Sequence, residues 1–235
     1  MSRPTYSWIL PIFDEAPALS RLIPRIVAAS RPHPFEIIAI NDASTDSSLR
    51  ILKTLTKKFS SLKIINLPSH QGKWPALATG LRRARGRIII TLDADLQDDP
   101  REFPKLTPYL KQGYDFISGW RFKRRDPVYK ILISLFGNWL ISLVTGHQFH
   151  DLNAPFKVFR HSLLKHLPLT GSLFRFSLLF AYKLGFHTLE VPIRHHSRRF
   201  GHSKFGLIKY VRILYDLIVI IFLFTGSNRL SKIKS

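Results

Sequence analysis

The 235-residue sequence predicts an α/β fold in which a mostly parallel sheet is flanked by helices. Two observations carry this prediction. Apolar runs of strand length alternate with helical segments over the first 92 residues, and a short polar segment follows each run. We expect strands at residues 6–12, 35–41, 63–67 and 87–92, with helices at 16–29, 47–59 and 75–85 between them.

The last of these strands has the clearest sequence signal. Residues 87–92 read RIIITL, a continuous apolar run that is typical of a strand buried on both faces of a parallel sheet. In open sheets of this kind, ligands bind beyond the carboxyl ends of the strands. The polar segments that follow the strands are therefore expected to meet at one edge of the sheet.

These polar segments contain an unusual number of carboxylates. They are residues 11–15 (PIFDE), 41–46 (NDASTD), 70–73 (HQGK) and 93–97 (DADLQ), and three of the four carry acidic side chains. Carboxylates that converge repel one another unless a cation lies between them. A hard divalent ion with oxygen ligands, Mg²⁺ or Mn²⁺, resolves this repulsion and can itself hold phosphates.

The segment after the buried strand is the best candidate for the metal site. Asp93 and Asp95 are two residues apart and share a face in extended geometry. Gln97 adds a neutral oxygen ligand. A pair of aspartates with one residue between them is common on protein surfaces, so it is the position directly after the strand that favours a metal site.

The other segments suggest contacts to a nucleotide. Asp42 is expected to accept hydrogen bonds from ribose hydroxyls or a base N–H, while Thr45 or Asp46 is expected to cap the following helix. Gly72 and Lys73 precede a helix, where a close approach and a cation suit a diphosphate. An ordinary turn is the alternative interpretation of Gly72 and Lys73.

Composition limits the kinds of partner. The formal net charge is +21, with 17 basic and 11 acidic residues in 1–115 but 19 basic and 4 acidic residues in 116–235. Such an excess indicates a polyanionic partner: nucleic acid, an anionic membrane surface or phosphorylated substrates. The chain has no cysteine, which excludes a disulfide scaffold, a thiolate metal site and a cysteine nucleophile.

Taken together, the motifs resemble those of the inverting family 2 glycosyltransferases, which have the GT-A fold. PIFDEA, NDASTD, HQGKWPAL and LDADLQDDP occur in the order typical of that family, and the DADLQ form is similar to that of the dolichyl- and polyprenyl-phosphate sugar synthases. The later segments 118–121 (SGWR), 151–160 (DLNAPFKVFR) and 190–204 (EVPIRHHSRRFGHSK) resemble further elements of these synthases. The resemblance covers about residues 5–205. Asp14, Asn41 and Pro155 depart from it, standing where Asn, Asp and Gly are usual.

The resemblance implies a sugar transfer from a nucleotide-sugar to a polyprenyl or dolichyl phosphate, with mannose mildly preferred and glucose or N-acetylhexosamine compatible. It implies three groups of site residues: Asp93, Asp95 and Gln97 around the metal; Pro11, Glu15, Asp42, Lys73 and Asp93 on the donor; and Arg121, Lys130, Arg198, Ser203 and Lys204 on phosphates of donor or acceptor. Asp95 and Arg121 are the expected catalytic residues. An ionised acceptor phosphate is already a nucleophile, so it needs positioning more than a strong base.

Two apolar segments suggest contact with a membrane surface. Residues 128–146 read as a helix with one polar stripe (Lys130, Ser134, Asn138 and Ser142), and residues 205–224 read as a second amphipathic helix. Two buried core helices are the alternative. The longest apolar run, 217–224, is too short to span a bilayer, and no signal peptide is recognisable.

These features predict a GT-A catalytic domain at 1–204 and an amphipathic helix with a basic tail at 205–235. They also predict peripheral attachment to the cytoplasmic face of a membrane, with a separate anchoring subunit as one way to achieve it. Two other functions stay open: a family 2 transferase with a glycolipid or polysaccharide acceptor and, more distantly, a nucleic-acid-binding protein. We expect no nucleic acid partner, because the basic residues accompany apolar helices rather than a known nucleic-acid module.

Overall fold

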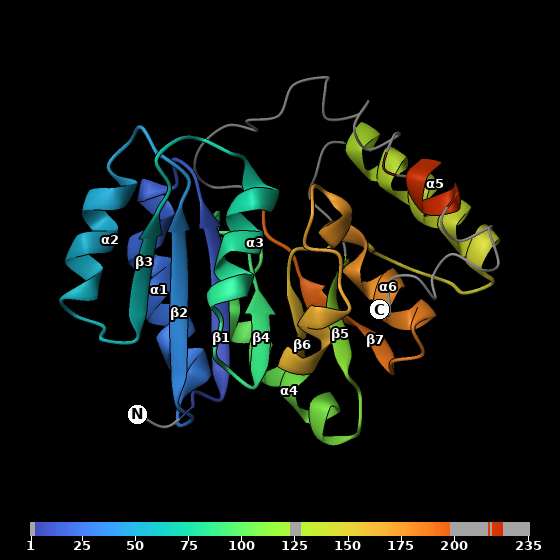
Figure 1. Cartoon of the computed structure of the whole chain (residues 1–235), viewed down its shortest axis with the longest axis horizontal. Coiled ribbons are helices and arrows are strands. Elements are labelled where there is room, and N and C mark those ends of the chain that lie inside the picture. The colour runs from blue at the N-terminus through green and yellow to red at the C-terminus, as the bar shows by residue number, and fades with distance from the viewer. Residues whose placement is uncertain (1–2, 123–127, 198–215, 217, 223–235) are drawn as a thin grey trace.

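The computed structural model describes residues 3–122, 128–197, 216 and 218–222 of the chain. A seven-stranded sheet runs through this part in the order β3-β2-β1-β4-β6-β5-β7 (Figure 1). Its strands are β1 (Tyr6–Ile12), β2 (Phe35–Asn41), β3 (Leu62–Asn66), β4 (Ile88–Thr91), β5 (Phe116–Phe122), β6 (Lys157–Arg160) and β7 (Thr188–Arg194). All neighbours pair in parallel except β6, which is antiparallel to both β4 and β5. The predicted α/β class and the four predicted strands are confirmed.

Helices cover both faces of this sheet. They are α1 (Ala16–Ser30), α2 (Ser48–Thr56), α3 (Lys73–Arg83), α4 (Phe103–Lys111), α5 (Val128–Thr145) and α6 (Ser177–Lys183), with the short 3-10 turns η1 (Pro100–Glu102), η2 (His161–Lys165) and η3 (Leu173–Phe176). In Figure 1, α3 lies in front of the sheet and α1 lies behind it. Three of these helices, α1 to α3, correspond to the helices that the sequence predicts between the first four strands.

Alternation along the strands divides the core into two apolar layers. Trp8 and Leu10 of β1 pack with Leu19 of α1 and Phe103 of α4 on one face. Ile9, between them in sequence, packs on the opposite face with the layer that contains α3 and α6. Successive side chains of a strand point to opposite faces, so a strand buried on both sides must be apolar throughout.

The direction of β6 matters for the site. Because it runs opposite to its neighbours, its first residue lies at the same edge as the carboxyl ends of β4 and β5. Lys157 pairs there with Thr91 of β4 and Ser118 of β5. The segment that leads into β6, which begins at Asp151, is thereby brought to the edge where the polar segments after β1, β2 and β4 also lie.

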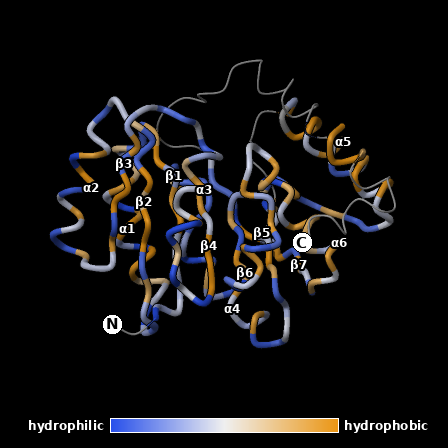
Figure 2. Tube along the Cα trace, viewed as in Figure 1, coloured by the Kyte–Doolittle hydropathy of each residue, from blue (hydrophilic) through white to orange (hydrophobic). Residues whose placement is uncertain are grey.

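Helix α5 presents its apolar side outwards. Leu132, Phe136 and Trp139 are each 59% exposed, whereas the described side chains of the predicted polar stripe are buried or partly buried. Asn138 is buried, and its Nδ2 donates to the carbonyl of His150 at 2.6 Å. The Oγ of Ser142 accepts a hydrogen bond from the backbone N–H of Phe149. The helix is therefore not a buried core helix, and Figure 2 shows hydrophobic residues along α5 at the margin of the described part of the chain.

Part of the second predicted amphipathic helix is also described. Asp216 is buried and accepts a hydrogen bond from Ser172 at 2.6 Å, with Arg175 at 3.6 Å. Ile220 packs in the same apolar layer as Ile141 of α5. The remainder of residues 205–224, and the expected boundary between residues 204 and 205, lie outside the described residues. No helix in the described ranges is long and apolar enough to cross a membrane.

Candidate active site

The loops that follow three parallel strands contain residues in a strained backbone conformation. Asp14 after β1, Ala43 after β2 and Leu96 after β4 have φ values of 51°, 53° and 61°. This left-handed region disfavours residues with a side chain, most of all one as large as leucine. Strain of this kind costs about 1–3 kcal/mol for each residue and is found mainly where surrounding structure fixes a functional loop. All three residues lie at the predicted ligand-binding edge.

A cavity opens at this edge. It holds about 770 Å³ of empty space, part of which is open to solvent. Its lining consists of Pro11, Ile12, Phe13, Glu15, Asp42, His70, Gly72, Lys73, Ala76, Asp93, Ala94 and Asp95. The structure thus brings together every residue predicted to bind the donor, along with Asp95. Gln97 and Arg121 do not belong to this lining.

Lys73, the first residue of α3, contacts the first aspartate of the DADLQ segment. Its Nζ lies 2.6 Å from one carboxylate oxygen of Asp93 and 2.7 Å from the other. Both side chains are partly exposed, at 25% and 30%. The ammonium group therefore compensates the negative charge of a carboxylate in the cavity.

Asp42 stabilises the turn before α3, a role that its sequence motif does not predict. Its two carboxylate oxygens accept the backbone N–H groups of Gln71 and Gly72, each at 2.8 Å, and His70 Nδ1 lies 3.0 Å from one of them. Gly72 has a φ of 91°, and a Cβ at this position would meet nothing within 4 Å. Space does not require a glycine here, but the positive φ does, because a residue without a side chain adopts it without strain. Gly72 therefore allows the backbone conformation that precedes α3. Asp42 lines the cavity while it holds this turn in place.

The loops after β1 and β2 are joined by polar contacts. Asp14 Oδ1 accepts from the N–H groups of Thr45 and Asp46, at 2.7 and 3.2 Å. The carboxylate of Asp46 in turn accepts from Ala16 and from Ser48, the first residues of α1 and α2. Asp46 thus contributes to capping as predicted, although Ser47 occupies the N-cap position and Thr45 does not cap the helix.

Asp95 and Gln97 occupy a tight turn beyond β4. Asp95 is 5% exposed, and its Oδ1 accepts the N–H of Gln97 at 3.1 Å. The side-chain amide of Gln97 lies against the end of β7, with its Nε2 3.3 Å from Nε2 of His195. His195 Nδ1 is 2.8 Å from Oδ1 of Asp98, and both of these side chains are buried. No sequence motif points to His195 and Asp98 as a pair, because 97 residues separate them.

Arg121, predicted to bind phosphate, is engaged in a buried ion pair. Its Nε and Nη2 donate to the two carboxylate oxygens of Asp151 at 2.6 and 2.9 Å. The two side chains are 10% and 1% exposed. Glu190 of β7 holds the same segment, since its carboxylate accepts the backbone N–H groups of His150 and Asp151. The bidentate geometry fixes the guanidinium plane beside the candidate site.

Lys157 lies beneath this ion pair and is 2% exposed. Its Nζ donates to the carbonyl of Leu152 at 3.1 Å. Burial lowers the pKa of Lys157 to about 7, which the negative charges of Asp151 and Glu190 oppose and the positive charges of Lys73 and Arg121 reinforce. A buried lysine in such a cluster is an additional candidate functional residue. DLNAPFKVFR contains it, but the motif by itself indicates no role for it.

This pKa predicts how stability depends on pH. Between about pH 7 and pH 10.5, the ordinary pKa of lysine, the unfolded chain retains a proton on Lys157 that the folded chain has released. The free energy of unfolding therefore rises with pH across this window. Below about pH 7, the full cost of burying the charged form of Lys157 lowers the stability. We expect Lys157→Met to remove this part of the rise when urea unfolding is measured at pH 7, 8 and 9. Parallel curves for wild type and variant would contradict the prediction.

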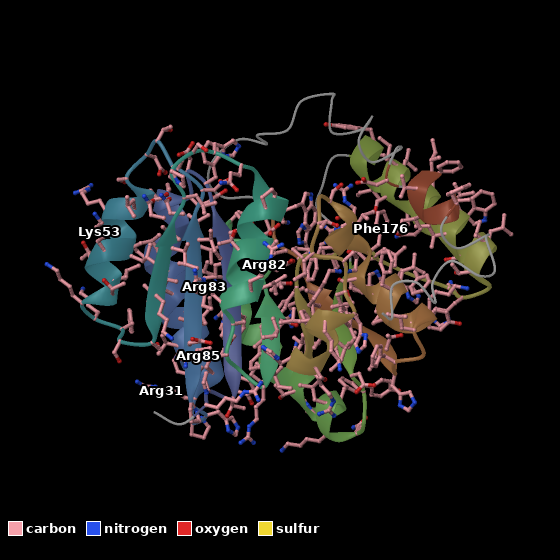
Figure 3. All side chains as sticks on the ribbon, in the orientation of Figure 1. Arg31, Lys53, Arg82, Arg83, Arg85 and Phe176 are labelled. Carbon is pink, nitrogen blue, oxygen red and sulfur yellow. The ribbon has the colours of Figure 1, made fainter. Side chains whose placement is uncertain are left out.

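Several predicted residues cannot be placed in the site. Arg198, Ser203 and Lys204 lie outside the described residues, as does the side chain of Lys130. Two basic residues of the first half lie away from the cavity: in Figure 3, Arg31 and Arg85 are near the end of the sheet opposite the carboxyl ends of β1, β2 and β4. Arg82 and Arg83 lie in the last turn of α3, where cations favour a helix.

The cavity is suited to a divalent metal that is held jointly with a substrate. No group of three or more His, Cys, Asp or Glu side chains in the described ranges is placed to hold a metal ion. Asp93 and Asp95 nevertheless line the same cavity. Mg²⁺ commonly binds through one or two carboxylates and completes its coordination with water and substrate phosphates. The donor set present here therefore fits such a metal when a diphosphate is bound beside it.

The fold and this edge together define an α/β protein with a cavity beyond the carboxyl ends of its parallel strands, where proteins of this class bind their ligands. Comparison with known proteins gives the family: residues 7–170 match the model of glycosyl transferase family 2, and the chain belongs to this family. The predicted family is confirmed.

Two curated relatives and one solved structure illustrate the similarity. The chain is 33% identical to a dodecaprenyl-phosphate galacturonate synthase of Rhizobium johnstonii over 92% of its length. It is 32% identical to an undecaprenyl-phosphate 4-deoxy-4-formamido-L-arabinose transferase of Edwardsiella ictaluri over 90% of its length. It spans 66% of each of these relatives.

The solved structure is a glucosyl-3-phosphoglycerate synthase of Mycobacterium tuberculosis in complex with Mn²⁺, UDP-glucose and phosphoglyceric acid. The TM-score is 0.69 at 17% identity, and the match covers 93% of this chain and 80% of that one. At this identity, the likeness concerns the fold.

Proposed function

We propose that this protein transfers a sugar from a nucleotide-sugar to a polyprenyl phosphate at a membrane surface. The observation that carries the proposal is the cavity in which Asp93, Asp95 and Lys73 meet, within a chain of glycosyl transferase family 2. The names of the two curated relatives, both of which refer to polyprenyl-phosphate acceptors, support the choice of acceptor. The Rhizobium and Edwardsiella proteins are named for different sugars, so the preference for mannose stays a prediction.

The donor would bind in the cavity with Mg²⁺ or Mn²⁺. Asp93 and Asp95 would hold the metal from the protein side, with Gln97 as a neutral ligand, and the metal would neutralise charge on the departing nucleoside diphosphate. Lys73 would exchange its contact with Asp93 for the donor diphosphate at the start of α3. The nucleotide would lie against Pro11, Glu15 and Asp42, which line the cavity.

The acceptor would approach from the side of β5 and β7. Arg121 is fixed there by Asp151, and we assign it the positioning of a phosphate, because a guanidinium in a fixed orientation suits the geometry of phosphate oxygens. Arg198, Ser203, Lys204 and Lys130 are proposed to share this task. The phosphate oxygen itself would attack the sugar, so the site supplies orientation and charge compensation in preference to a base.

Helix α5 supports attachment to a lipid surface. The exposed large apolar side chains of the described ranges lie on α5, on residues 218–222 or at Phe122. An apolar patch of this extent is unfavourable in water and marks an interaction surface. A polyprenyl acceptor keeps its tail in a bilayer, so a lipid surface is the partner that serves this reaction. We therefore propose peripheral attachment at the cytoplasmic face, either directly or with an anchoring subunit.

Removal of two of these side chains should reduce attachment strongly. Burying one Phe or Trp contributes about 1.5–3 kcal/mol, so the double substitution Phe136→Ser and Trp139→Ser should weaken partitioning about 100-fold or more. Sedimentation with vesicles that contain anionic lipid measures this. Lys53→Ser on α2, which is exposed at the far side of the molecule in Figure 3, is the matched control and should bind as wild type does. Equal binding by all three proteins would contradict the assignment of α5.

A donor screen tests the proposed transfer. The protein is incubated with vesicles that contain polyprenyl phosphate, with Mn²⁺ and with a panel of labelled nucleotide-sugars, mannose, glucose and N-acetylhexosamine donors included. We expect label in the lipid fraction with at least one donor. Absence of lipid-linked label with every donor would contradict the proposal.

The remaining alternatives differ from this function in their acceptor or class. A family 2 transferase with a glycolipid or polysaccharide acceptor would use the same donor cavity. A nucleic-acid-binding protein would show steep salt-dependent affinity for nucleic acid, which we do not expect. The proposed division into a catalytic domain at 1–204 and a C-terminal helix with basic tail at 205–235 applies to either transferase.

A further inference from the structure

The turn that contains Asp95 and Gln97 is hydrogen-bonded to the end of β7. Asp98 and His195 form an isolated antiparallel bridge, and the N–H of His196 donates to the carbonyl of Gln97 at 2.8 Å. The side chains add further contacts, from Gln97 to His195 and from His195 to Asp98. Two segments nearly 100 residues apart thus form one unit, in which His195 stands between a carboxylate and an amide.

The carboxylate determines which nitrogen of His195 carries the proton. Asp98 Oδ1 lies 2.8 Å from Nδ1, and an ionised carboxylate can only accept hydrogen bonds. In the neutral imidazole, this contact assigns the proton to Nδ1 and leaves the lone pair on Nε2. This is the arrangement by which a carboxylate commonly sets the tautomer and the ring orientation of a histidine.

The lone pair in turn determines how the amide of Gln97 is oriented. Its NH₂ group lies 3.3 Å from Nε2 of His195 and 3.4 Å from the carbonyl oxygen of His196. Both of these atoms accept, so both require the nitrogen end of the amide on this side. The oxygen Oε1 is then directed away from β7. The side chain of Gln97 is partly exposed.

We propose that His195 is a positioning residue for Gln97, which by accepting the amide N–H keeps Oε1 available as a metal ligand. The inference rests on the proposed role of Gln97 in holding Mg²⁺ or Mn²⁺. A reversed amide would direct two N–H groups towards the cation, which they cannot coordinate. Asp98 acts one step further away, through the tautomer of His195.

A double-mutant cycle on metal binding tests this inference. Mn²⁺ affinity of the full-length protein is measured by electron paramagnetic resonance of free Mn²⁺, with a fixed concentration of inorganic pyrophosphate as the diphosphate probe. Loss of such a supporting contact typically weakens metal binding about 10- to 100-fold. We expect about this loss in Gln97→Ala and in His195→Ala, and no further loss when the two are combined.

Three more variants separate positioning from folding. His195→Asn keeps a donor near Asp98 but lacks the acceptor for Gln97, so it should lose Mn²⁺ affinity as His195→Ala does while it retains more thermal stability. His195→Gln places an acceptor near the position of Nε2 and should retain more Mn²⁺ affinity than His195→Asn. His196→Ala keeps the backbone carbonyl that Gln97 contacts and should leave Mn²⁺ affinity unchanged.

Two results would overturn the inference. Independent, multiplying losses in the double variant would show that His195 does not act through Gln97. Wild-type Mn²⁺ affinity in Gln97→Ala would remove the role of Gln97 as ligand and with it the task of His195. Neither result bears on lipid-linked product formation in the donor screen, so failure of the transfer proposal is recognised separately.

Discussion

Asp95→Asn is expected to lower the rate of sugar transfer by at least about 100-fold. The substitution keeps the size of the side chain but removes the negative charge that would hold the metal, and loss of one preorganised electrostatic contact of this kind typically costs about 10²–10³ in rate. Asp95 is 5% exposed and lines the cavity, so few other groups can replace it there. Initial rates at saturating donor, over a range of Mn²⁺ concentrations, measure the effect.

A carboxylate at the other edge of the sheet provides the control. Asp115 precedes β5 and pairs with Arg160 at 3.1 Å, with side chains 26% and 40% exposed. Asp115→Asn should transfer sugar within about twofold of the wild-type rate, since ion pairs that are open to solvent contribute little. A rate for Asp95→Asn equal to that of Asp115→Asn would remove Asp95 from the catalytic site.

Asp151→Ala is expected to destabilise the protein by about 3–5 kcal/mol. The substitution leaves the guanidinium of Arg121 buried without this carboxylate, and a buried charge that loses its partner costs this much. It also removes a negative charge that favours the protonated form of Lys157. Urea unfolding at constant pH measures the change in the free energy of unfolding.

The matched comparison is again at Asp115. Asp115→Ala breaks a partly exposed ion pair and a hydrogen bond from the backbone N–H of His187, and it should cost about 1–2 kcal/mol. Arg121→Lys keeps the charge but not the two parallel hydrogen bonds, so it should fall between wild type and Asp151→Ala. Equal destabilisation by Asp151→Ala and Asp115→Ala would contradict the view that the Arg121 pair is buried and preorganised.

The cavity that we propose for the donor could be anticipated from sequence because its lining depends on local order. In a parallel sheet, every segment after a strand reaches the same edge, so the contact between Lys73 and Asp93 follows from two strand ends and one helix start. Short apolar runs and Gly72 mark these positions clearly. The strained conformations of Ala43 and Leu96 carry no such mark, because neither residue type indicates a positive φ.

The region that we propose for the acceptor depends on topology that the sequence pattern does not encode. Arg121 and Asp151 meet only because β6 enters the sheet antiparallel between β4 and β5. His195 and Asp98 are likewise joined by the end of β7. For α5, the spacing of four predicts a polar stripe but not its direction. Its member Asn138 is buried and donates a hydrogen bond to the carbonyl of His150.

The chemistry of the acceptor is the central claim, and the lipid product tests it most directly. Polyprenyl phosphate and the corresponding polyprenol, which lacks the phosphate, are offered in separate vesicles with the active nucleotide-sugar, and the lipids are analysed by mass spectrometry. We predict that only polyprenyl phosphate gains the mass of one sugar residue, with one nucleoside diphosphate released for each product. Transfer to polyprenol at a similar rate, or release of free sugar without a lipid product, would contradict the account.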